Sequence, residues 1–370
     1  MNKFYILLLV SFFFISCKTN KVVEKKTTES TKIRFIGEQI IPANAKFNDT
    51  KIGGLSSIDF VDGKYYLISD DKDKPIRFYE MKLTFNAQEF SEIEITNVIK
   101  IENDSKGIDP EALRFDKSSG NFIWTSEGHI RKGISPAIFE VTKNGVAVRT
   151  IPTPKILQVT KDYKKTGPRR NGTFEGLSMS SNPNYFWVGM ELPLKQDGEE
   201  PQLEQGNYPV RISKINKKTG ALEYQFVYQL DAIPRDSKPS NKFIVNGLPE
   251  ILEVAKNQFL FVERAYASGH KDGGNTVKIY KVDCTKATDV SNIESLKTTN
   301  YQSAIKTEVF NFENIRSKLT NGIVDNIEGI TFGPKLSNGN RTLIVVSDNN
   351  FNKFSTQLSQ VIVLEIRLEL

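Results

Sequence analysis

Cysteine and histidine are scarce in this chain of 370 residues, which contains two of each. Two cysteines cannot build a disulfide framework, and two histidines leave little basis for a His-rich zinc or iron site. The motifs G-x-S-x-G, H-E-x-x-H and G-x-x-x-x-G-K-[ST] are absent from the sequence. An α/β-hydrolase nucleophile, a zinc-protease helix and a phosphate-binding P-loop are therefore not indicated.

The composition is that of a globular domain with a large core. Apolar residues make up 38% and charged residues 25% of the chain. This balance excludes a polytopic membrane protein and a wholly disordered chain. The 24 Phe, 12 Tyr and 2 Trp supply the bulky side chains that such a core needs.

An apolar segment, residues 4–15, follows Lys3 and is interrupted by a single Ser. Its length suits the apolar region of an export signal and is short of the ~20 residues of a membrane span. With the cysteine that follows, the segment resembles a bacterial lipoprotein signal in which Phe14 replaces the usual Leu. We therefore predict a signal peptide over residues 1–16 and lipid attachment at Cys17. The alternative is an ordinary secretory signal followed by a chance cysteine.

Residues 18–32 are polar, rich in Lys and Thr, and without apolar periodicity. With Cys17 they form a predicted flexible tether over residues 17–32, ahead of a folded domain over residues 33–370. The formal charge is +6, and removal of residues 1–16 with their single Lys makes it +5. Because five lysines lie in the tether, the charge does not indicate nucleic-acid binding. We expect a cell-envelope lipoprotein, anchored in the outer membrane by its lipid alone.

The predicted domain contains an internal repeat. Four segments share a Glu followed by a short β-type run, and a fifth has Ser in the Glu place. This Glu or Ser position recurs every 55 to 78 residues. A turn and a second strand that ends in an acid follow each segment. The segments are 56–60, 110–115, 174–179, 249–254 and 327–332, and the acids are Asp70, Glu127, Glu191, Glu263 and Asp348. This period and strand length predict propeller blades that carry insertions.

We predict an all-β propeller of five blades. The last repeat lacks a fourth strand, and residues 33–40 can supply it by pairing with residues 360–368, which closes the ring and removes exposed sheet edges. Three longer connections could instead hide a sixth blade: 153–170, 232–246 and 284–304. A pair of β-sandwiches is the rival architecture.

The repeat segments resemble the bacterial phytase-like family described as "esterase-like activity of phytase". The resemblance covers roughly residues 50–368 and implies an exported propeller-like domain with phosphoester or carboxylester hydrolase activity. It rests on residues 53–56, 109–112, 171–177, 325–334 (DNIEGITFGP) and 343–351 (LIVVSDNNF).

The repeat also predicts where the acids converge. In a tight antiparallel hairpin the numbers of paired residues have a nearly constant sum, so two acids fall at the same end of the first hairpin of a repeat. The predicted pairs are Glu111 with Ser126, Glu175 with Gly189, and Glu250 with Val262. Since the first strand of a propeller blade lines the axis, the acids should ring one mouth of the channel.

Carboxylates this close to one another need a counter-charge. Ca²⁺ takes 6–8 oxygen ligands, whereas Mg²⁺ prefers many waters and zinc prefers thiols and imidazoles. We therefore predict a Ca²⁺ site with the ligands Glu111, Glu175, Glu191, Glu250, Glu328 and Asp348. The alternative is that these acids are structural, accept backbone N–H groups and pair with arginines.

Basic side chains and both histidines flank the same rim. A histidine that faces an ester can act as general acid. Catalytic roles are predicted for His129, His270 and Arg264, and substrate binding for Arg131, Arg169, Arg170 and Lys271.

Two classes of function fit this pattern. The first is an exported, cation-dependent ester hydrolase that acts on phosphate esters first and on carboxylesters or lactones second. The second is a non-catalytic envelope propeller that binds a ligand or a protein partner. For the hydrolase we expect a monomer with a small-molecule ester substrate and no nucleic-acid partner.

Overall fold

The computed structural model describes residues 33–72, 75–103, 107–352 and 357–367. The predicted signal peptide 1–16, the lipidation site Cys17 and the tether 17–32 lie outside the described residues. In the described ranges the helices are short 3₁₀ turns, and none is long and apolar enough to cross a membrane.

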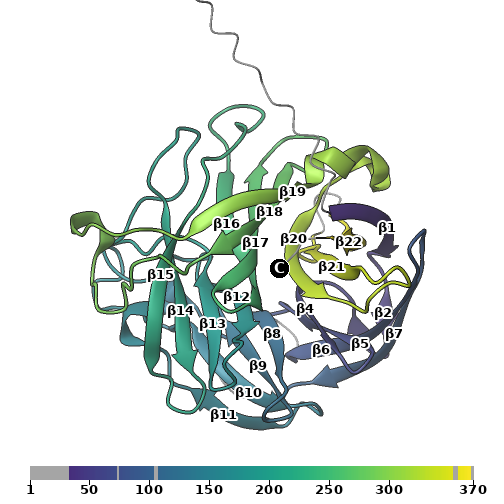
Figure 1. The fold of residues 1–370 in the computed structure, drawn as a ribbon, viewed down its shortest axis with the longest axis horizontal. Coiled ribbons are helices and arrows are strands. Elements are labelled where there is room, and N and C mark those ends of the chain that lie inside the picture. The colour runs from purple at the N-terminus through teal and green to yellow at the C-terminus, as the bar shows by residue number, and fades with distance from the viewer. Residues whose placement is uncertain (1–32, 73–74, 104–106, 353–356, 368–370) are drawn as a thin grey trace, which may run out of the picture. The chain divides into compact units, whose positions relative to one another are not determined.

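Five antiparallel sheets of four strands each surround a central axis (Figure 1). From the innermost strand outward, the first three blades are β4 (Leu55–Val61), β5 (Lys64–Ser69), β6 (Arg77–Phe85) and β7 (Phe90–Lys100); β8 (Pro110–Asp116), β9 (Asn121–Ser126), β10 (Ala137–Thr142) and β11 (Ala147–Ile151); and β12 (Phe174–Met179), β13 (Tyr185–Met190), β14 (Pro209–Asn216) and β15 (Leu222–Gln229). The fourth is β16 (Ile244–Ala255), β17 (Gln258–Ala267), β18 (Asn275–Asp283) and β19 (Ile305–Asn311), and the fifth is β20 (Asn326–Phe332), β21 (Arg341–Asp348), β22 (Ser359–Ile366) and β1 (Ile33–Ile41).

The remaining elements lie in the connections. They are the small hairpin of β2 (Lys46–Phe47) and β3 (Thr50–Lys51), and the 3₁₀ turns η1 (Ile130–Lys132), η2 (Lys155–Leu157), η3 (Leu296–Thr298), η4 (Phe312–Lys318) and η5 (Thr320–Gly322). The three long connections 153–170, 232–246 and 284–304, which could hide a sixth blade, form no further sheet among the described residues. The five-blade prediction is confirmed, and the two-sandwich alternative is wrong.

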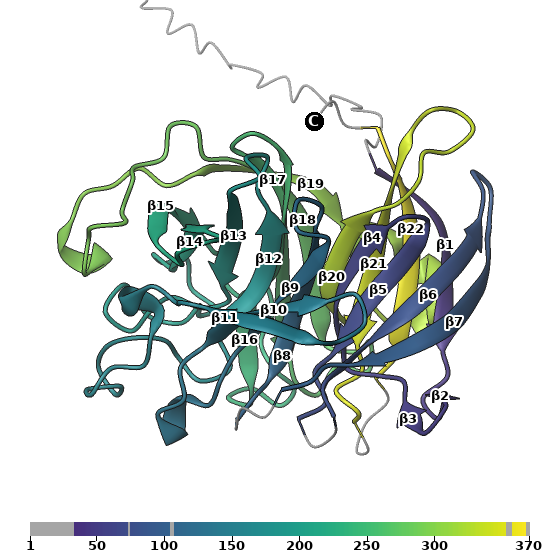
Figure 2. The ribbon, with the colours of Figure 1, turned by 90° about the horizontal axis from the view of Figure 1, so that it is seen from below.

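The N-terminal strand closes the ring as predicted. β1 pairs with β22 along its length, from Ile33 opposite Ile366 to Ile41 opposite Ser359. Apolar layers fill the spaces between neighbouring sheets, which stand side by side around the axis in the perpendicular view (Figure 2). Trp124 is buried in the layer between the first two blades.

Removal of the closing strand should destabilise the whole ring. Deletion of residues 33–40 exposes the edge of β22 and removes Ile33 and Ile36 from two apolar layers. We expect the melting temperature, measured by circular dichroism, to fall by roughly 10 °C or more, or the protein to fail to fold. Deletion of residues 18–30 is the control and should leave the melting temperature within about 1–2 °C of the wild-type value. Equal melting temperatures for the two truncations would contradict ring closure.

Candidate functional site

A β-bulge occurs in the innermost hairpin of each blade, near one end of the channel. In the second, third and fifth blades the bulge contains the repeated Glu, which is Glu111, Glu175 or Glu328. A bulge adds one residue to one strand and thereby changes the register across it. The predicted pairing of Glu111 with Ser126 is therefore wrong, because Ser126 pairs with Pro110. The pairing of Glu250 with Val262 is confirmed.

In the fourth blade the bulge lies two residues earlier relative to the repeated Glu. The register breaks between Gly247 and Glu250, so Leu248 takes the place that Glu holds in the second, third and fifth blades. In the second strand Ala265, opposite Asn246, takes the place of the acid, and Arg264 precedes it. The guanidinium of Arg264 lies beside carboxylates of the two neighbouring blades, Glu191 and Glu328.

The expected place of Glu250 at the mouth is therefore corrected. Its Oε2 lies 2.6 Å from Nη2 of Arg114, and its Oε1 accepts the N–H groups of Leu177 at 3.3 Å and Ile251 at 2.9 Å. Glu263 also turns away and accepts a hydrogen bond from Nζ of Lys306 at 2.7 Å. Both carboxylates are paired inside the protein, and neither lines the cavity in which the other acids gather.

The other acids converge as expected. Seven carboxylates line one cavity of about 890 Å³, which we call the mouth cavity. Five of them belong to the predicted ligand set, and Asp70 and Glu127 complete the group. They come from the first, second, third and fifth blades: Asp70, Glu111, Glu127, Glu175, Glu191, Glu328 and Asp348.

This concentration of buried acid is electrostatically unbalanced. Burial, followed by repulsion from neighbouring carboxylates, raises the pKa of Glu111 and Glu175 well above the usual range. Burial likewise raises the pKa of Glu191 to about 7 and that of Glu328 to about 8, against the opposing effect of Arg264. Nη2 of Arg264 lies 3.2 Å from Oε1 of Glu191 and 3.5 Å from Oε1 of Glu328. Arg264, together with Lys72 and Lys271 on the same cavity, cannot neutralise all seven carboxylates.

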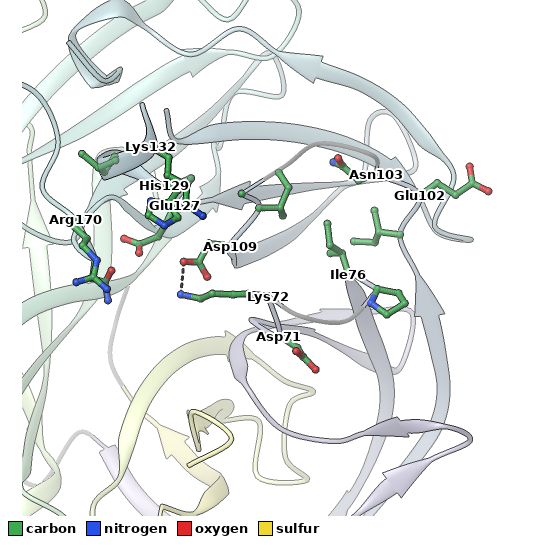
Figure 3. Close-up of a pocket in the computed structure, with 17 residues that line it drawn as sticks. Asp71, Lys72, Ile76, Glu102, Asn103, Asp109, Glu127, His129, Lys132 and Arg170 are labelled. Atoms are coloured by element: carbon green, nitrogen blue, oxygen red, sulfur yellow. Dashed lines mark ion pairs between the residues drawn. The ribbon is translucent and has the colours of Figure 1, made fainter. Parts of the chain in front are cut away.

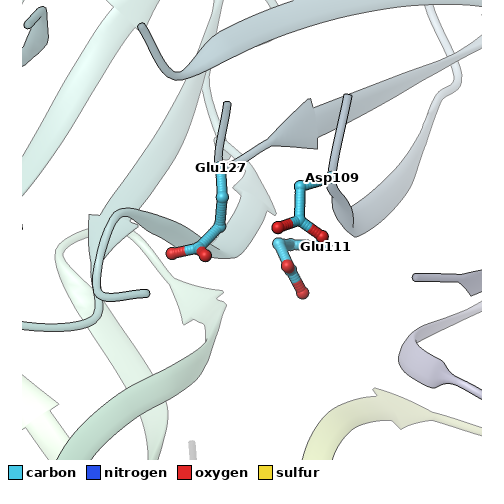
Figure 4. A group of neighbouring side chains, drawn as sticks. All are labelled: Asp109, Glu111 and Glu127. Carbon is cyan, nitrogen blue, oxygen red and sulfur yellow. The ribbon is translucent and has the colours of Figure 1, made fainter. Parts of the chain in front are cut away.

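Three of the acids in and beside this mouth form a compact triad, Asp109, Glu111 and Glu127 (Figure 4). Each offers a carboxylate oxygen, and these oxygens lie within 4.8 Å of one another. Oε1 of Glu127 accepts the N–H groups of Gly172 and Thr173, both at 2.8 Å, which fixes its orientation. The buried Oδ1 of Asp109 has no hydrogen-bond partner among the described residues. An oxygen-only donor set with an unsatisfied buried carboxylate oxygen fits a hard divalent cation.

The sequence reasoning missed Asp109 as a ligand. It compared only the repeated Glu and the acid that ends the second strand, and Asp109 occurs two residues before Glu111 in one repeat. Its backbone carbonyl accepts the N–H of Glu127 at 2.9 Å, which ties the two ends of the hairpin together. The Asp-Pro-Glu run was the available signal.

A second cavity of about 880 Å³ adjoins the triad, and we call it the side cavity (Figure 3). His129, Lys132 and Arg170 line it, and it shares Lys72, Glu127 and Asn171 with the mouth cavity. Nζ of Lys72 lies 2.5 Å from Oδ2 of Asp109. The predicted residues His129 and Arg170 therefore line a cavity that adjoins the acids.

The remaining predicted residues divide into two groups. His270 and Lys271 line the mouth cavity, where Nε2 of His270 donates to the carbonyl oxygen of Asp236 at 2.8 Å. Arg131 is exposed and lines neither cavity.

Arg169 points away from the site. It donates to the carbonyl oxygens of Pro193 at 2.9 Å and Gly198 at 2.8 Å, and it pairs with Glu200. The expected substrate contacts of Arg131 and Arg169 are therefore corrected. The loop of Arg131 carries its side chain outward, and the side chain of Arg169 crosses to a neighbouring loop.

Solved structures with a similar fold share little sequence with this chain. An endo-arabinase from Bacteroides thetaiotaomicron is 11% identical, with 89% of this chain and 98% of that chain covered and a TM-score of 0.46. The catalytic domain of a GH62 α-L-arabinofuranosidase from Coprinopsis cinerea is also 11% identical, with 90% and 97% covered and a TM-score of 0.45. No curated protein matches the sequence.

The family comparison covers most of the chain. The match extends over residues 50–351, from the strand pair that precedes the first blade to the loop after β21. It includes the seven carboxylates of the mouth cavity and every residue that lines the side cavity. The chain belongs to the phytase-like family, described as "Esterase-like activity of phytase".

Proposed function

We propose that this protein is an exported, cation-dependent ester hydrolase that acts on phosphate esters. The observation that carries the proposal is the surplus of carboxylates at the mouth, where seven acids face three basic side chains, Arg264, Lys72 and Lys271. Such a group is costly without a counter-charge, and buried acids with strongly raised pKa values mark functional sites. Membership of a family described by esterase-like activity supports an ester as the substrate.

The triad Asp109, Glu111 and Glu127 is the proposed cation site, and Ca²⁺ is the proposed ion. Carboxylates and the nearby Asn171 amide offer oxygen ligands, and no thiol or imidazole takes part. A hard cation held there would polarise the ester oxygen and lower the pKa of a bound water. Glu127, held by two backbone N–H groups, keeps its oxygen in a fixed orientation.

The side cavity supplies the remaining groups. Arg170 and Lys132 bind the oxygens of the phosphate, since charge-assisted hydrogen bonds to such oxygens are the strong ones. His129 lies on the same wall, where its imidazole donates a proton to the leaving oxygen as general acid. Arg264 keeps Glu191 and Glu328 in place as their counter-charge.

The residues outside the described structure complete the proposal. The apolar segment 4–15 and Cys17 support export and lipid anchoring at the outer membrane. The enzyme would then act as a monomer on small esters in the envelope.

The variant Glu111→Gln tests the proposed activity. It keeps the shape of the side chain and removes one ligand charge, so we expect calcium affinity to fall by about tenfold or more. Hydrolysis of a phosphate monoester should fall with it, as measured by calorimetry and by an assay with and without chelator.

Glu140→Gln is the matched control, because Glu140 is a buried glutamate of the same blade that pairs with Arg149 away from both cavities. It should leave calcium binding unchanged. A wild-type protein that binds no calcium, or hydrolyses carboxylesters alone, would contradict the proposal and favour a binding protein or a carboxylesterase, respectively.

A further inference from the structure

Lys72 occupies a position between the acids and the side cavity that the proposed chemistry has not used. Its Nζ lies 2.5 Å from Oδ2 of Asp109, one of the triad carboxylates, while 53% of its side chain is exposed. It lines both cavities (Figure 3). The lysine is thus an internal counter-ion at the place where a cation would contact Asp109.

This ion pair is easily exchanged. An ion pair with a half-exposed lysine contributes about 0–1 kcal/mol, because solvent screens it and the long side chain loses freedom. The other oxygen of Asp109, Oδ1, is buried and has no hydrogen-bond partner among the described residues. Lys72 therefore pairs with only one oxygen of this carboxylate, Oδ2. A divalent cation in the triad could also take Oδ1 as a ligand.

Replacement of Lys72 by a divalent cation at Asp109 would change the net charge of the side cavity. Three basic residues, Lys72, Lys132 and Arg170, face four acidic ones, Asp71, Glu102, Asp109 and Glu127. No acid among the described residues pairs with Lys132 or Arg170 within 4.0 Å. An anion that enters the cavity meets a surplus of negative charge while Lys72 is held by Asp109. Neutralisation of Asp109 and Glu127 by a cation reverses that balance and releases a third basic group.

We propose that Lys72 competes with the divalent cation for Asp109 and, once displaced, binds the anionic group of the substrate in the side cavity. This inference rests on the proposed cation site. It makes Lys72 a binding residue that couples the two ligands, so the cation and a phosphate group tighten each other's binding by the same factor.

The test is calorimetry on the wild-type protein, Lys72→Met and Lys132→Met. The probes are Ca²⁺ alone, and inorganic phosphate with and without Ca²⁺ at concentrations below the solubility limit of calcium phosphate. Lys132→Met removes the same charge from the same cavity without touching Asp109. Lys72→Met should bind Ca²⁺ about 5-fold more tightly than the wild type, and more tightly than Lys132→Met. The factor by which Ca²⁺ tightens phosphate binding should fall about 5-fold in Lys72→Met relative to the wild type.

The outcomes separate the two proposals. A wild-type protein that binds no Ca²⁺ overturns the cation site and this inference with it. Ca²⁺ binding that is present but equal in Lys72→Met and Lys132→Met, with an unchanged coupling factor, overturns the inference alone and leaves the proposed function standing.

Discussion

Without a divalent cation, the protein should lose stability as the pH rises from about 5 to about 8. The folded-state pKa values of Glu191, about 7, and Glu328, about 8, lie above the ordinary value of 4.5. Across this window the unfolded chain releases protons that the folded protein still holds, so the free energy of unfolding falls with pH. Each pKa unit corresponds to about 1.4 kcal/mol, and the loss should be on the order of 3 kcal/mol or more. Thermal melts in chelator across this pH range measure it.

Two further conditions test the cause of this pH dependence. Saturating calcium should flatten the curve, because calcium binds the ionised carboxylates of the folded state, so its stabilisation, RT ln(1 + [L]/Kd), grows as the pH rises. The double variant Glu191→Gln/Glu328→Gln should reduce the slope in chelator, because these two side chains can no longer ionise, while Glu111 and Glu175 keep their contribution. Chelated wild-type protein that melts at one temperature from about pH 5 to about pH 8 would contradict the electrostatic account.

The second large effect concerns Arg114, which joins all five blades on the channel axis. This buried side chain comes from β8 and donates to the carbonyl oxygens of Ile58, Leu177 and Ile330 and to the carboxylate of Glu250. Those partners lie on the innermost strands of the other four blades. Replacement by Met leaves a buried carboxylate and three carbonyls without this donor. We expect Arg114→Met to lower the free energy of unfolding by about 3–5 kcal/mol, measured by urea denaturation.

The control is Arg149→Met, which removes an arginine that is 37% exposed from its pair with Glu140. It should cost about 1 kcal/mol or less. Burial raises the pKa of Glu250 to about 7 even beside Arg114, so the deficit of Arg114→Met should shrink at about pH 5, where Glu250 becomes neutral. Equal losses for the two variants would show that the axial ion pair does not hold the blades together.

Much of the fold follows from local patterns. The repeated Glu and the alternating apolar residues predict five hairpins, because the side-chain period of a strand is visible in sequence. The missing fourth strand of the last repeat and the spare β-type segment 33–40 together predict ring closure. Both features depend on hydrogen-bonded pairing within or between identifiable strands, and the structure confirms both.

Part of the candidate site could likewise be predicted from the repeat, and part could not. The gathering of Glu111, Glu175 and Glu328 at one mouth could be predicted, because repeated residues of a propeller occupy equivalent positions. The sequence by itself determined the five repeated hairpins, the closing strand and this acidic mouth. Only the tertiary structure decided that Glu250 lies inside the channel with Arg114, that Arg264 lies beside Glu191 and Glu328, and that Lys72 pairs with Asp109 of the triad. A shift of the bulge by two residues redirects a side chain. Loop lysines are placed by contacts with other blades, which no local pattern records.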